Sequence, residues 1–274
     1  MNPETNTTAK GRIANILSVA GSDPSGGAGV QADLKAISAN GAYGMAALTA
    51  LTAQNTQGVQ GVHLVPPEFV ADQIRVVAED VRIDAVKIGM IATAEIARAV
   101  AETLPDVPVV LDPVMVAKGG ASLLAEDAVA ALREALVPKA AVITPNLPEA
   151  AALLGCDAAV TRGAMAEQAE ALRALGCAAV LLKGGHLDGE ESPDVLADAN
   201  GVHWFEGVRV DTRNTHGTGC TLSAALAARI GRGEPVPEAV AEAKAYVARA
   251  IAGAGALDVG SGHGPTHHFA GIWA

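Results

Sequence analysis

The segment "NTHGTGCTLSAALAARI" (214–230) joins a glycine-rich turn to a run of small residues that is typical of a buried helix. The turn is formed by His216-Gly217-Thr218-Gly219, and Cys220 follows at the expected start of the helix. Backbone N–H groups at the start of a helix form a ready site for an anion. The alternative for Cys220 is that it packs as a small apolar side chain. The segment therefore predicts an anion-binding turn beside a thiol.

A second glycine-rich segment, "GSDPSGGAGVQADLKAI" (21–37), has the pattern of a turn from a strand into a helix. It matches neither the P-loop pattern nor the dinucleotide-binding pattern of glycines. Asp33 is a carboxylate just inside an otherwise apolar helix, which favours a ligand pocket over a plain capped turn. Gln54 follows the next apolar run, and its amide offers a donor and an acceptor to a heterocycle. The alternative for Gln54 is a loop side chain that bonds to the backbone.

Two carboxylates and a lysine follow other apolar runs. Asp112 and Glu149 each come after a predicted buried strand, and such a pair could hold Mg²⁺ directly or through water. Helix capping is the rival role for either acid, because Asn146 and Glu149 have the spacing of a capping box. Lys183 ends an apolar strand, where a contact with phosphate would explain its charge.

Short β-rich apolar runs alternate with longer alanine-rich helical patterns along the chain. Predicted strands cover 13–20, 45–53, 85–89, 107–113, 140–146, 178–185, 194–198 and 202–210. Predicted helices cover 28–40, 67–80, 94–104, 123–136, 147–154, 163–175, 218–230 and 236–253. This alternation predicts right-handed crossovers and a mostly parallel sheet. Ligands of such sheets bind beyond the carboxyl ends of the strands, where we expect the polar candidates to gather.

Composition narrows the classes of protein further. Hydrophobic residues make up 50% of the 274 residues and aromatic residues only 3%, which suits a parallel sheet under helices. The net charge of −11 disfavours a nucleic-acid or anionic-membrane surface. The three widely spaced cysteines form neither a disulfide framework nor a zinc pattern, which favours the reducing cytosol. We expect a disordered tail over 1–12 and a single domain over 13–274.

Seven segments, taken in order, resemble the motifs of a known family. They are "AGSDPSGGAGVQADLKA", "TALTAQNTQGV", "KIGM", "LDPVMVAKGG", "ITPNLPEA", "LLKGGH" and "HGTGCTLSAALAA". On these motifs, residues 13–269 resemble the hydroxymethylpyrimidine/phosphomethylpyrimidine kinases of thiamine biosynthesis, within the ribokinase-like superfamily. The resemblance implies a ribokinase-like three-layer α/β/α sandwich. It also implies ATP-dependent phosphorylation of 4-amino-5-hydroxymethyl-2-methylpyrimidine, and then of its monophosphate to the diphosphate.

The resemblance also implies roles for the candidate residues. The pocket for the pyrimidine ring would be lined by Gly21, Asp33, Gln54 and Met90. Mg²⁺ and its waters would be organised by Asp112, Asn146 and Glu149. The phosphates of ATP would be bound by Lys183, Asn146, Gly217 and Gly219.

Residues 217–220, which include Thr218, would form the anion hole for the transferred phosphoryl group, with Cys220 as the general base. Many members of the superfamily have aspartate at that position, whereas the pyrimidine-kinase branch has cysteine. Because the helix dipole favours an anion, we expect the pKa of the Cys220 thiol to lie below its usual value of about 8.5.

Two alternatives stay open at this point. One is a pyridoxal/pyridoxine kinase, since that vitamin also carries a hydroxymethyl group on a nitrogen ring. The other is a non-catalytic pyrimidine-binding sensor, against which Asp112, Glu149, Lys183 and the anion turn argue. The expected partners are small molecules rather than nucleic acid or membrane, and the resemblance implies a cytoplasmic homodimer.

Overall fold

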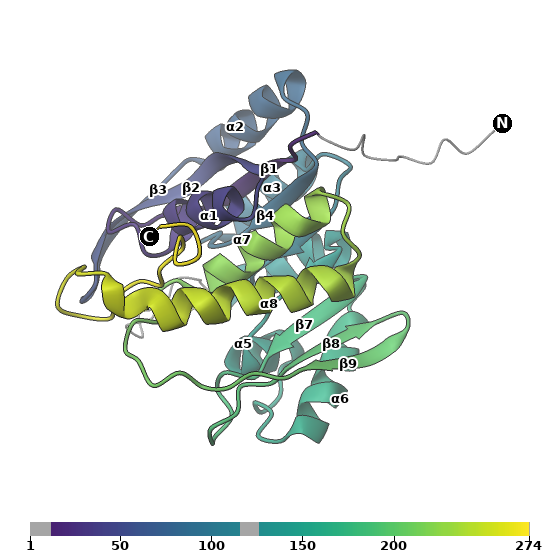
Figure 1. Ribbon diagram of the computed structural model, residues 1–274. Helices are drawn as coiled ribbons and strands as arrows, with labels where there is room; N and C mark the ends of the chain where they lie inside the picture. The colour runs from purple at the N-terminus through teal and green to yellow at the C-terminus, as the bar shows by residue number, and fades with distance from the viewer. Residues whose placement is uncertain (1–11, 116–125, 274) are drawn as a thin grey trace.

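The computed structural model describes residues 12–115 and 126–273. All but the last residue of the predicted tail (1–12) lies outside the described residues, as does the start (123–125) of one predicted helix. The described chain folds into a central sheet with helices on both sides (Figure 1).

The described residues form one nine-stranded sheet in the order β3-β2-β1-β4-β5-β6-β7-β8-β9. Its strands are β1 (Asn15–Ser22), β2 (Tyr43–Asn55), β3 (Gly58–Leu64), β4 (Ala85–Ile88), β5 (Val109–Leu111), β6 (Val142–Ile143), β7 (Ala179–Lys183), β8 (Asp194–Asp198) and β9 (Gly201–Phe205). The six strands β1, β2 and β4 to β7 are parallel, whereas β3, β8 and β9 pair antiparallel with their neighbours. The predicted mostly parallel sheet is confirmed.

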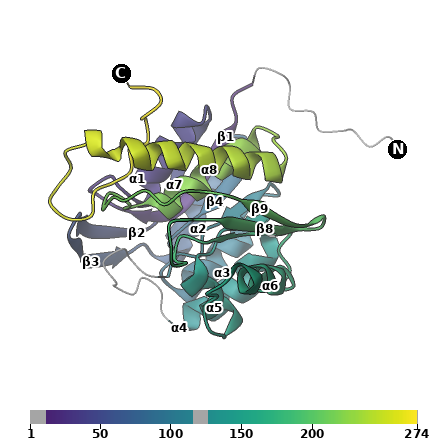
Figure 2. The same cartoon turned by 60° about the horizontal axis from the view of Figure 1, so that its bottom comes forward.

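Helices cover both faces of the sheet and complete three layers (Figure 2). They are α1 (Gly29–Ala39), α2 (Pro67–Asp80), α3 (Ala94–Thr103), α4 (Glu126–Ala131), α5 (Leu147–Leu154), α6 (Arg162–Arg173), α7 (Thr218–Gly231) and α8 (Val236–Ala252). Buried residues of α1, α7 and α8 pack on one face, and those of α2 to α6 pack on the other. A turn of π-helix, Leu132–Leu136, extends α4. The three-layer α/β/α sandwich is therefore confirmed.

Small residues allow α7 to lie close to the sheet. Every residue of α7 from Thr221 to Ala228 is buried. At the far end of the helix, an ideal Cβ built on Gly231 would lie 2.4 Å from Ile16 Cδ1, so a larger residue would push the helix away. This close packing holds the first turn of α7 in a fixed position beyond the carboxyl ends of the strands.

Strand β3 was not predicted from the sequence. Strand β2 continues to Asn55 and pairs antiparallel with β3, so Gln54 lies within a strand instead of after one. Most of β3 is exposed on both faces, which leaves its sequence without the apolar alternation of a half-buried strand. The last predicted strand (202–210) is shorter and ends at Phe205.

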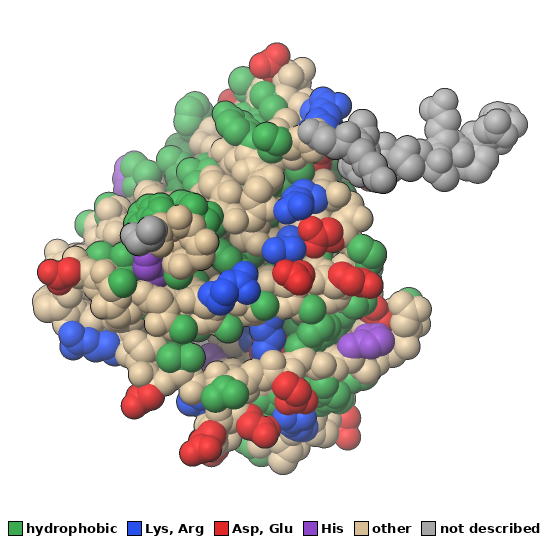
Figure 3. Space-filling view, viewed as in Figure 1, with side chains coloured by type: hydrophobic (Ala, Val, Ile, Leu, Met, Phe, Trp, Pro, Cys, Tyr) green, Lys and Arg blue, Asp and Glu red, His purple; other side chains and the backbone are tan. Residues whose placement is uncertain are grey.

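Charged side chains of both signs are interspersed on the face that Figure 3 shows. Among the ion pairs of the described residues, Arg229 donates to Glu234 at 3.1 Å. Within the part of the chain that the structure describes, no helix combines the length and apolar character needed to cross a bilayer.

Candidate active site

The first turn of α7 lies against two other parts of the predicted site. An ideal Cβ built on Gly219 would be 3.3 Å from Lys183 Nζ and 3.4 Å from Asp112 Oδ2. Gly217 has a φ of +75°, which favours glycine, and its ideal Cβ would lie 1.8 Å from the carbonyl oxygen of Gly27. The turn therefore touches a charged pair on one side and the second glycine-rich segment on the other.

The backbone of this turn is suited to an anion. Gly217 precedes the first helical residue, so the N–H groups of the first turn have no acceptor within α7. The helix dipole adds a partial positive charge at the same end. Thr218 stiffens the turn, because its hydroxyl donates to the carbonyl of Thr215 at 2.8 Å.

Lys183 connects the two predicted metal-binding acids. Its Nζ donates to Asp112 Oδ1 at 2.9 Å and lies 3.9 Å from Glu149 Oε2. Asn146 is held beside it by a β-bridge to Lys183. The ends of β5, β6 and β7 thus bring four of the predicted residues together.

Burial and mutual charge set the pKa values in this cluster. Burial raises the pKa of Glu149 to about 7, and the Lys183 ammonium offsets this effect only in part. Burial acts in the same direction on Asp112, but Lys183 and then Lys87 outweigh it and hold the pKa of Asp112 below its usual range. Burial would lower the pKa of Lys183, yet the two carboxylates raise it. Asp112 and Lys183 are therefore charged at neutral pH, while Glu149 is close to its titration point.

Sequence reasoning missed two hydroxyl groups beside Asp112. Thr144 donates from Oγ1 to Asp112 Oδ1 at 3.1 Å. Ser223 lies with Oγ 3.4 Å from Oδ2, although the carbonyl oxygen of Gly219 is a nearer acceptor for its hydrogen, at 3.0 Å. Ser223 is one turn beyond Cys220 on α7, where a polar residue in the buried run "TLSAALAA" was an available signal.

The capping role considered for Glu149 is confirmed. Asn146 Oδ1 accepts from the N–H of Glu149 at 2.8 Å, and Glu149 Oε2 accepts from the N–H of Asn146 at 2.8 Å. The cap engages one carboxylate oxygen and does not itself exclude a metal. Across 12–115 and 126–273, no three His, Cys, Asp or Glu side chains form a metal-binding group. Mg²⁺ is usually bound by one or two carboxylates together with water and phosphate, and Asp112 and Glu149 supply two carboxylates of that kind.

The residues predicted to line the ring pocket differ in exposure: Gln54 is half-buried, whereas Gly21, Met90 and Asp33 are buried. An ideal Cβ on Gly21 would lie 2.4 Å from Met90 Cε, so these two residues are in direct contact. Asp33 is fully buried, and its Oδ2 accepts from Ser18 Oγ at 2.6 Å and from Lys87 Nζ at 2.8 Å. Asp33 therefore lies in the protein interior, in an ion pair with Lys87.

Lys87 was not assigned a role from the sequence, although a lysine inside the apolar run "AVKIG" was a signal. Its side chain is fully buried on β4. Burial would lower the pKa of Lys87, but the Asp33 carboxylate raises it above its usual value. Gly89 makes room for the ammonium, since an ideal Cβ there would be 2.6 Å from Lys87 Nζ.

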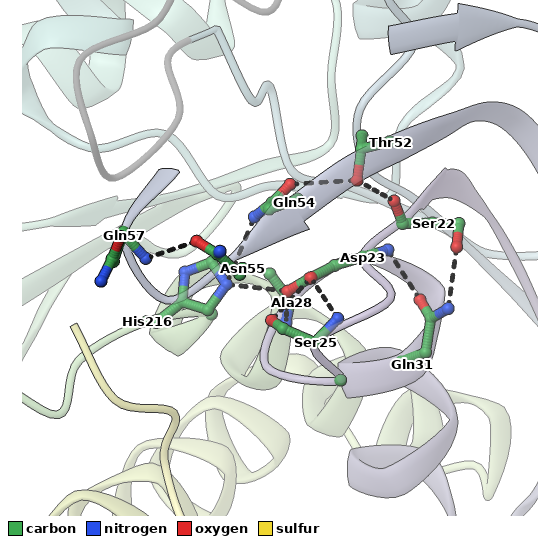
Figure 4. A network of polar contacts seen from close by, with 12 residues as sticks. Ser22, Asp23, Ser25, Ala28, Gln31, Thr52, Gln54, Asn55, Gln57 and His216 are labelled. Carbon is green, nitrogen blue, oxygen red and sulfur yellow. Dashed lines mark hydrogen bonds and ion pairs between the residues drawn. The ribbon is translucent and has the colours of Figure 1, made fainter. Parts of the chain in front are cut away.

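Gln54 lies in a polar network that joins β2 to both glycine-rich segments (Figure 4). Its Nε2 is 3.4 Å from His216 Nε2, and the same ring nitrogen is 2.8 Å from Asp23 Oδ2. Neither Asp23 nor His216 was assigned a role from the sequence, although both stand inside the quoted motifs.

Comparison with known proteins shows which family the chain belongs to. The model of the phosphomethylpyrimidine kinase family matches residues 23–267. The hydroxymethylpyrimidine/phosphomethylpyrimidine kinase of Escherichia coli K12 is 55% identical over 262 residues, which cover 94% of this chain and 98% of that protein. This chain belongs to the phosphomethylpyrimidine kinase family.

Solved structures of two kinases share the fold. The phosphomethylpyrimidine kinase of Clostridium difficile 630 is 41% identical with a TM-score of 0.77, over 87% of this chain and 99% of that one. An ADP complex of Bacillus subtilis pyridoxal kinase is 37% identical with a TM-score of 0.84, over 94% and 98%. The ribokinase-like fold expected for a member of this kinase family is confirmed.

Within this kinase fold, Cys220 is the third residue of α7 and is half-buried. The expectation of a lowered thiol pKa is wrong. Burial raises the pKa of Cys220 to about 11; Lys87 opposes the rise, while the carboxylates of Asp33 and Asp112 add to it. The thiol is therefore protonated at neutral pH.

Proposed function

We propose that this chain transfers the γ-phosphoryl group of ATP to the hydroxymethyl group of 4-amino-5-hydroxymethyl-2-methylpyrimidine, and then phosphorylates the monophosphate, in thiamine diphosphate biosynthesis. The observation that carries this proposal is the anion turn of α7 beside the Lys183–Asp112 pair. Membership of the phosphomethylpyrimidine kinase family supports the choice of substrate.

The geometry suits direct transfer between two oxygens. An acceptor oxygen attacks the γ-phosphorus, the bond from that phosphorus to the β–γ bridging oxygen breaks, and ADP leaves. The N–H groups of 217–220 stabilise the charge on the transferred group, and the Lys183 ammonium, oriented by Asp112, neutralises nucleotide phosphate. The thiolate form of Cys220 would receive the proton of the first acceptor, and because the pKa of the thiol is raised to about 11, only a small fraction of the enzyme holds that form at neutral pH.

Mg²⁺ is part of the proposal. When bound, it would neutralise phosphate charge. Asp112 and Glu149 would hold it, and Asn146 would fix the position of Glu149 through the capping box. Gly21, Gln54 and Met90 would contact the pyrimidine ring, and Asp33 would support the pocket from below.

A pyridoxal or pyridoxine kinase is the second candidate. The fold shared with Bacillus subtilis pyridoxal kinase, at 37% identity, is the observation that favours it. The higher identity of 55% to the pyrimidine kinase of Escherichia coli argues for the first candidate.

A coupled assay of ADP formation separates the candidates. We expect kcat/KM for the hydroxymethylpyrimidine to exceed that for pyridoxine by at least about tenfold, a difference of about 1.4 kcal/mol. EDTA should abolish activity and Mg²⁺ should restore it. Equal or higher kcat/KM for pyridoxine would favour the second candidate, and binding without ADP formation would indicate a sensor.

We further propose a single-domain homodimer in the cytoplasm. The exposed apolar side chains of Val62 and Leu64 lie on one face of the β2–β3 pair, which a second copy would cover. Sedimentation of wild-type protein and of Val62→Lys should show a dimer and a monomer, respectively.

A further inference from the structure

Asp23 is a buried carboxylate with a full set of donors around it. Its Oδ1 accepts from the N–H and the hydroxyl of Ser25, at 2.9 and 2.7 Å. Its Oδ2 accepts from the N–H of Ala28 at 2.8 Å and lies 2.8 Å from His216 Nε2. Burial would raise the pKa of Asp23, but the contacts with His216 and Ser25 outweigh it and lower the pKa. Asp23 is thus an ionised acceptor.

This ionised carboxylate fixes the proton on His216. A carboxylate can only accept, so the ring nitrogen 2.8 Å from it must carry hydrogen and donate. The ring packs closely against Gly27, since an ideal Cβ there would lie 2.5 Å from His216 Cδ2. Nε2 of His216 therefore presents an N–H group, and not a lone pair, to its surroundings.

On the other side of Gln54, the hydroxyl hydrogen of Thr52 is also held in one direction. Its hydroxyl donates to the carbonyl oxygen of Ser22 at 2.8 Å. A hydroxyl has one hydrogen, so Thr52 Oγ1 can offer only lone pairs to the Gln54 amide, which lies 3.2 Å away.

These two neighbours determine which way the amide of Gln54 faces. With Nε2 towards His216 and Oε1 towards Thr52, a donor meets a donor at 3.4 Å and an acceptor meets an acceptor at 3.2 Å. Rotating the amide by a half-turn exchanges Nε2 and Oε1 and makes both contacts favourable. Nε2 then donates to Thr52, and Oε1 shares the N–H of His216.

The amide keeps one N–H and one lone pair after these two contacts, because it starts with two of each. A heterocycle with an amine next to a ring nitrogen has the complementary pair, an N–H and a lone pair side by side. The pyrimidine of the proposed substrate carries such an edge. A pyridoxine ring has no amine beside its nitrogen and would leave one group of the amide unpaired.

We infer that Asp23 and His216, together with Thr52, fix the orientation of the Gln54 amide and so make the site select an aminopyrimidine. Asp23, His216 and Thr52 are positioning residues, and Gln54 is the residue that contacts the ring. This inference rests on the proposed function, since it concerns how the same site recognises its substrate.

The test compares two acceptors in each variant: the aminopyrimidine substrate and 5-hydroxymethyl-2-methylpyrimidine, which lacks the amine. The readout is the ratio of their kcat/KM values. His216→Ala should reduce this ratio by about tenfold, as expected for one lost hydrogen bond. His216→Gln should restore it, because an amide N–H can reach Asp23 and Gln54. The exposed His63→Ala is the matched control and should leave the ratio unchanged.

Thr52→Val and Thr52→Ser test the inference from the opposite side of Gln54. Valine removes the acceptor without changing the size of the side chain and should also lower the ratio, whereas serine should keep it. If these residues had a purely structural role, their substitution would lower kcat/KM for both acceptors equally and leave the ratio unchanged. An unchanged ratio in His216→Ala and Thr52→Val would therefore overturn this inference but not the proposed function. A wild-type chain that phosphorylates neither acceptor would overturn the proposed function as well.

Discussion

At the scale of single residues, the role of Cys220 should differ between the two phosphorylations, because their acceptor groups differ. The first phosphorylation uses a hydroxyl, which must lose a proton as its oxygen attacks. The second uses a phosphate oxygen that is already ionised at neutral pH, since its second pKa is about 6. A base at Cys220 is therefore useful in one step only.

Cys220→Ala should accordingly lower kcat for the hydroxymethylpyrimidine by about 10²-fold, at the low end of general-base effects, and leave kcat for the monophosphate nearly intact. In the wild type, the first kcat should rise as pH increases from 7 towards the pKa of about 11, because the ionised fraction of the thiol grows. The variant should lose this rise. Separate pH–rate profiles for the two acceptors measure this, with the exposed Cys156→Ala as control. Equal loss in both steps would refute the base role.

Substitution of Lys183 should affect both phosphorylations and also stability, unlike substitution of Cys220, because Lys183 contacts two carboxylates. Lys183→Met keeps the length of the side chain and removes its charge, so we expect a higher KM for ATP and lower kcat in both steps. Removing the cation also leaves Asp112 and Glu149 near each other without compensation, which should lower Tm. Titration of ATP beside thermal melting measures both effects. The exposed Lys139→Met should change neither, and unchanged ATP kinetics in Lys183→Met would remove Lys183 from the site.

Single residues were predictable where the sequence pattern showed their position. Asp112, Glu149 and Lys183 follow apolar runs, and the structure brings them together. The pair of Asp23 and His216 could not be read from the sequence, because its partners are 193 residues apart. The pKa of Cys220 was predicted in the wrong direction because helix position is visible in a sequence and desolvation is not.

At the scale of elements, Gly217 lets the anion turn meet the segment after β1. Gly217→Ala should cost roughly 1–2 kcal/mol for its positive φ alone, and more because the added Cβ would lie 1.8 Å from the carbonyl oxygen of Gly27. The displaced turn should also lower kcat in both steps. Chemical denaturation and kinetics measure the two effects.

Gly155 supplies a matched control for that substitution. It also has a positive φ, of +69°, but nothing lies within 4 Å of its ideal Cβ. Gly155→Ala should therefore show the conformational cost and keep its activity. If Gly217→Ala lost no more stability or activity than Gly155→Ala, the close contact between the two glycine-rich segments would be contradicted.

Most elements could be predicted because buried parallel strands and amphipathic helices have distinct periods. Helices α2, α5 and α8 and strand β8 lie within a residue of their predicted bounds. The exposed strand β3 has no buried face, so its sequence lacks the alternation that predicts a strand. Its discovery matters for the site, since the β2–β3 pairing places Gln54 in a strand.

At the scale of the whole molecule, the C-terminal segment packs against the start of α7. The N–H of His216 donates to the carbonyl of Gly264 at 3.0 Å, and the buried His268 lies with Nε2 3.1 Å from Thr221 Oγ1. The last part of the chain, 47 residues further along the sequence at His268, thus contacts the start of α7 directly.

Burial lowers the pKa of His268 from 6.5 to about 4, which makes the stability of this packing depend on pH. The unfolded chain binds a proton at a higher pH than the folded one, so stability is lost as pH falls from 6.5 towards 4. Between pH 7 and pH 5 the loss should be on the order of 2 kcal/mol. Denaturant unfolding of wild type and His268→Gln at both pH values measures it, and the variant should lose less. An identical pH dependence would show that His268 does not titrate this way.

The central claim is that one site carries out two successive phosphorylations of an aminopyrimidine. Phosphorus-31 NMR of a reaction with limiting hydroxymethylpyrimidine and excess ATP and Mg²⁺ tests it most directly. The account predicts a monophosphate signal that rises and then gives way to a diphosphate, with two ADP formed for each pyrimidine consumed. A reaction that stops at the monophosphate, or that proceeds as well with pyridoxine as with the pyrimidine, would contradict it.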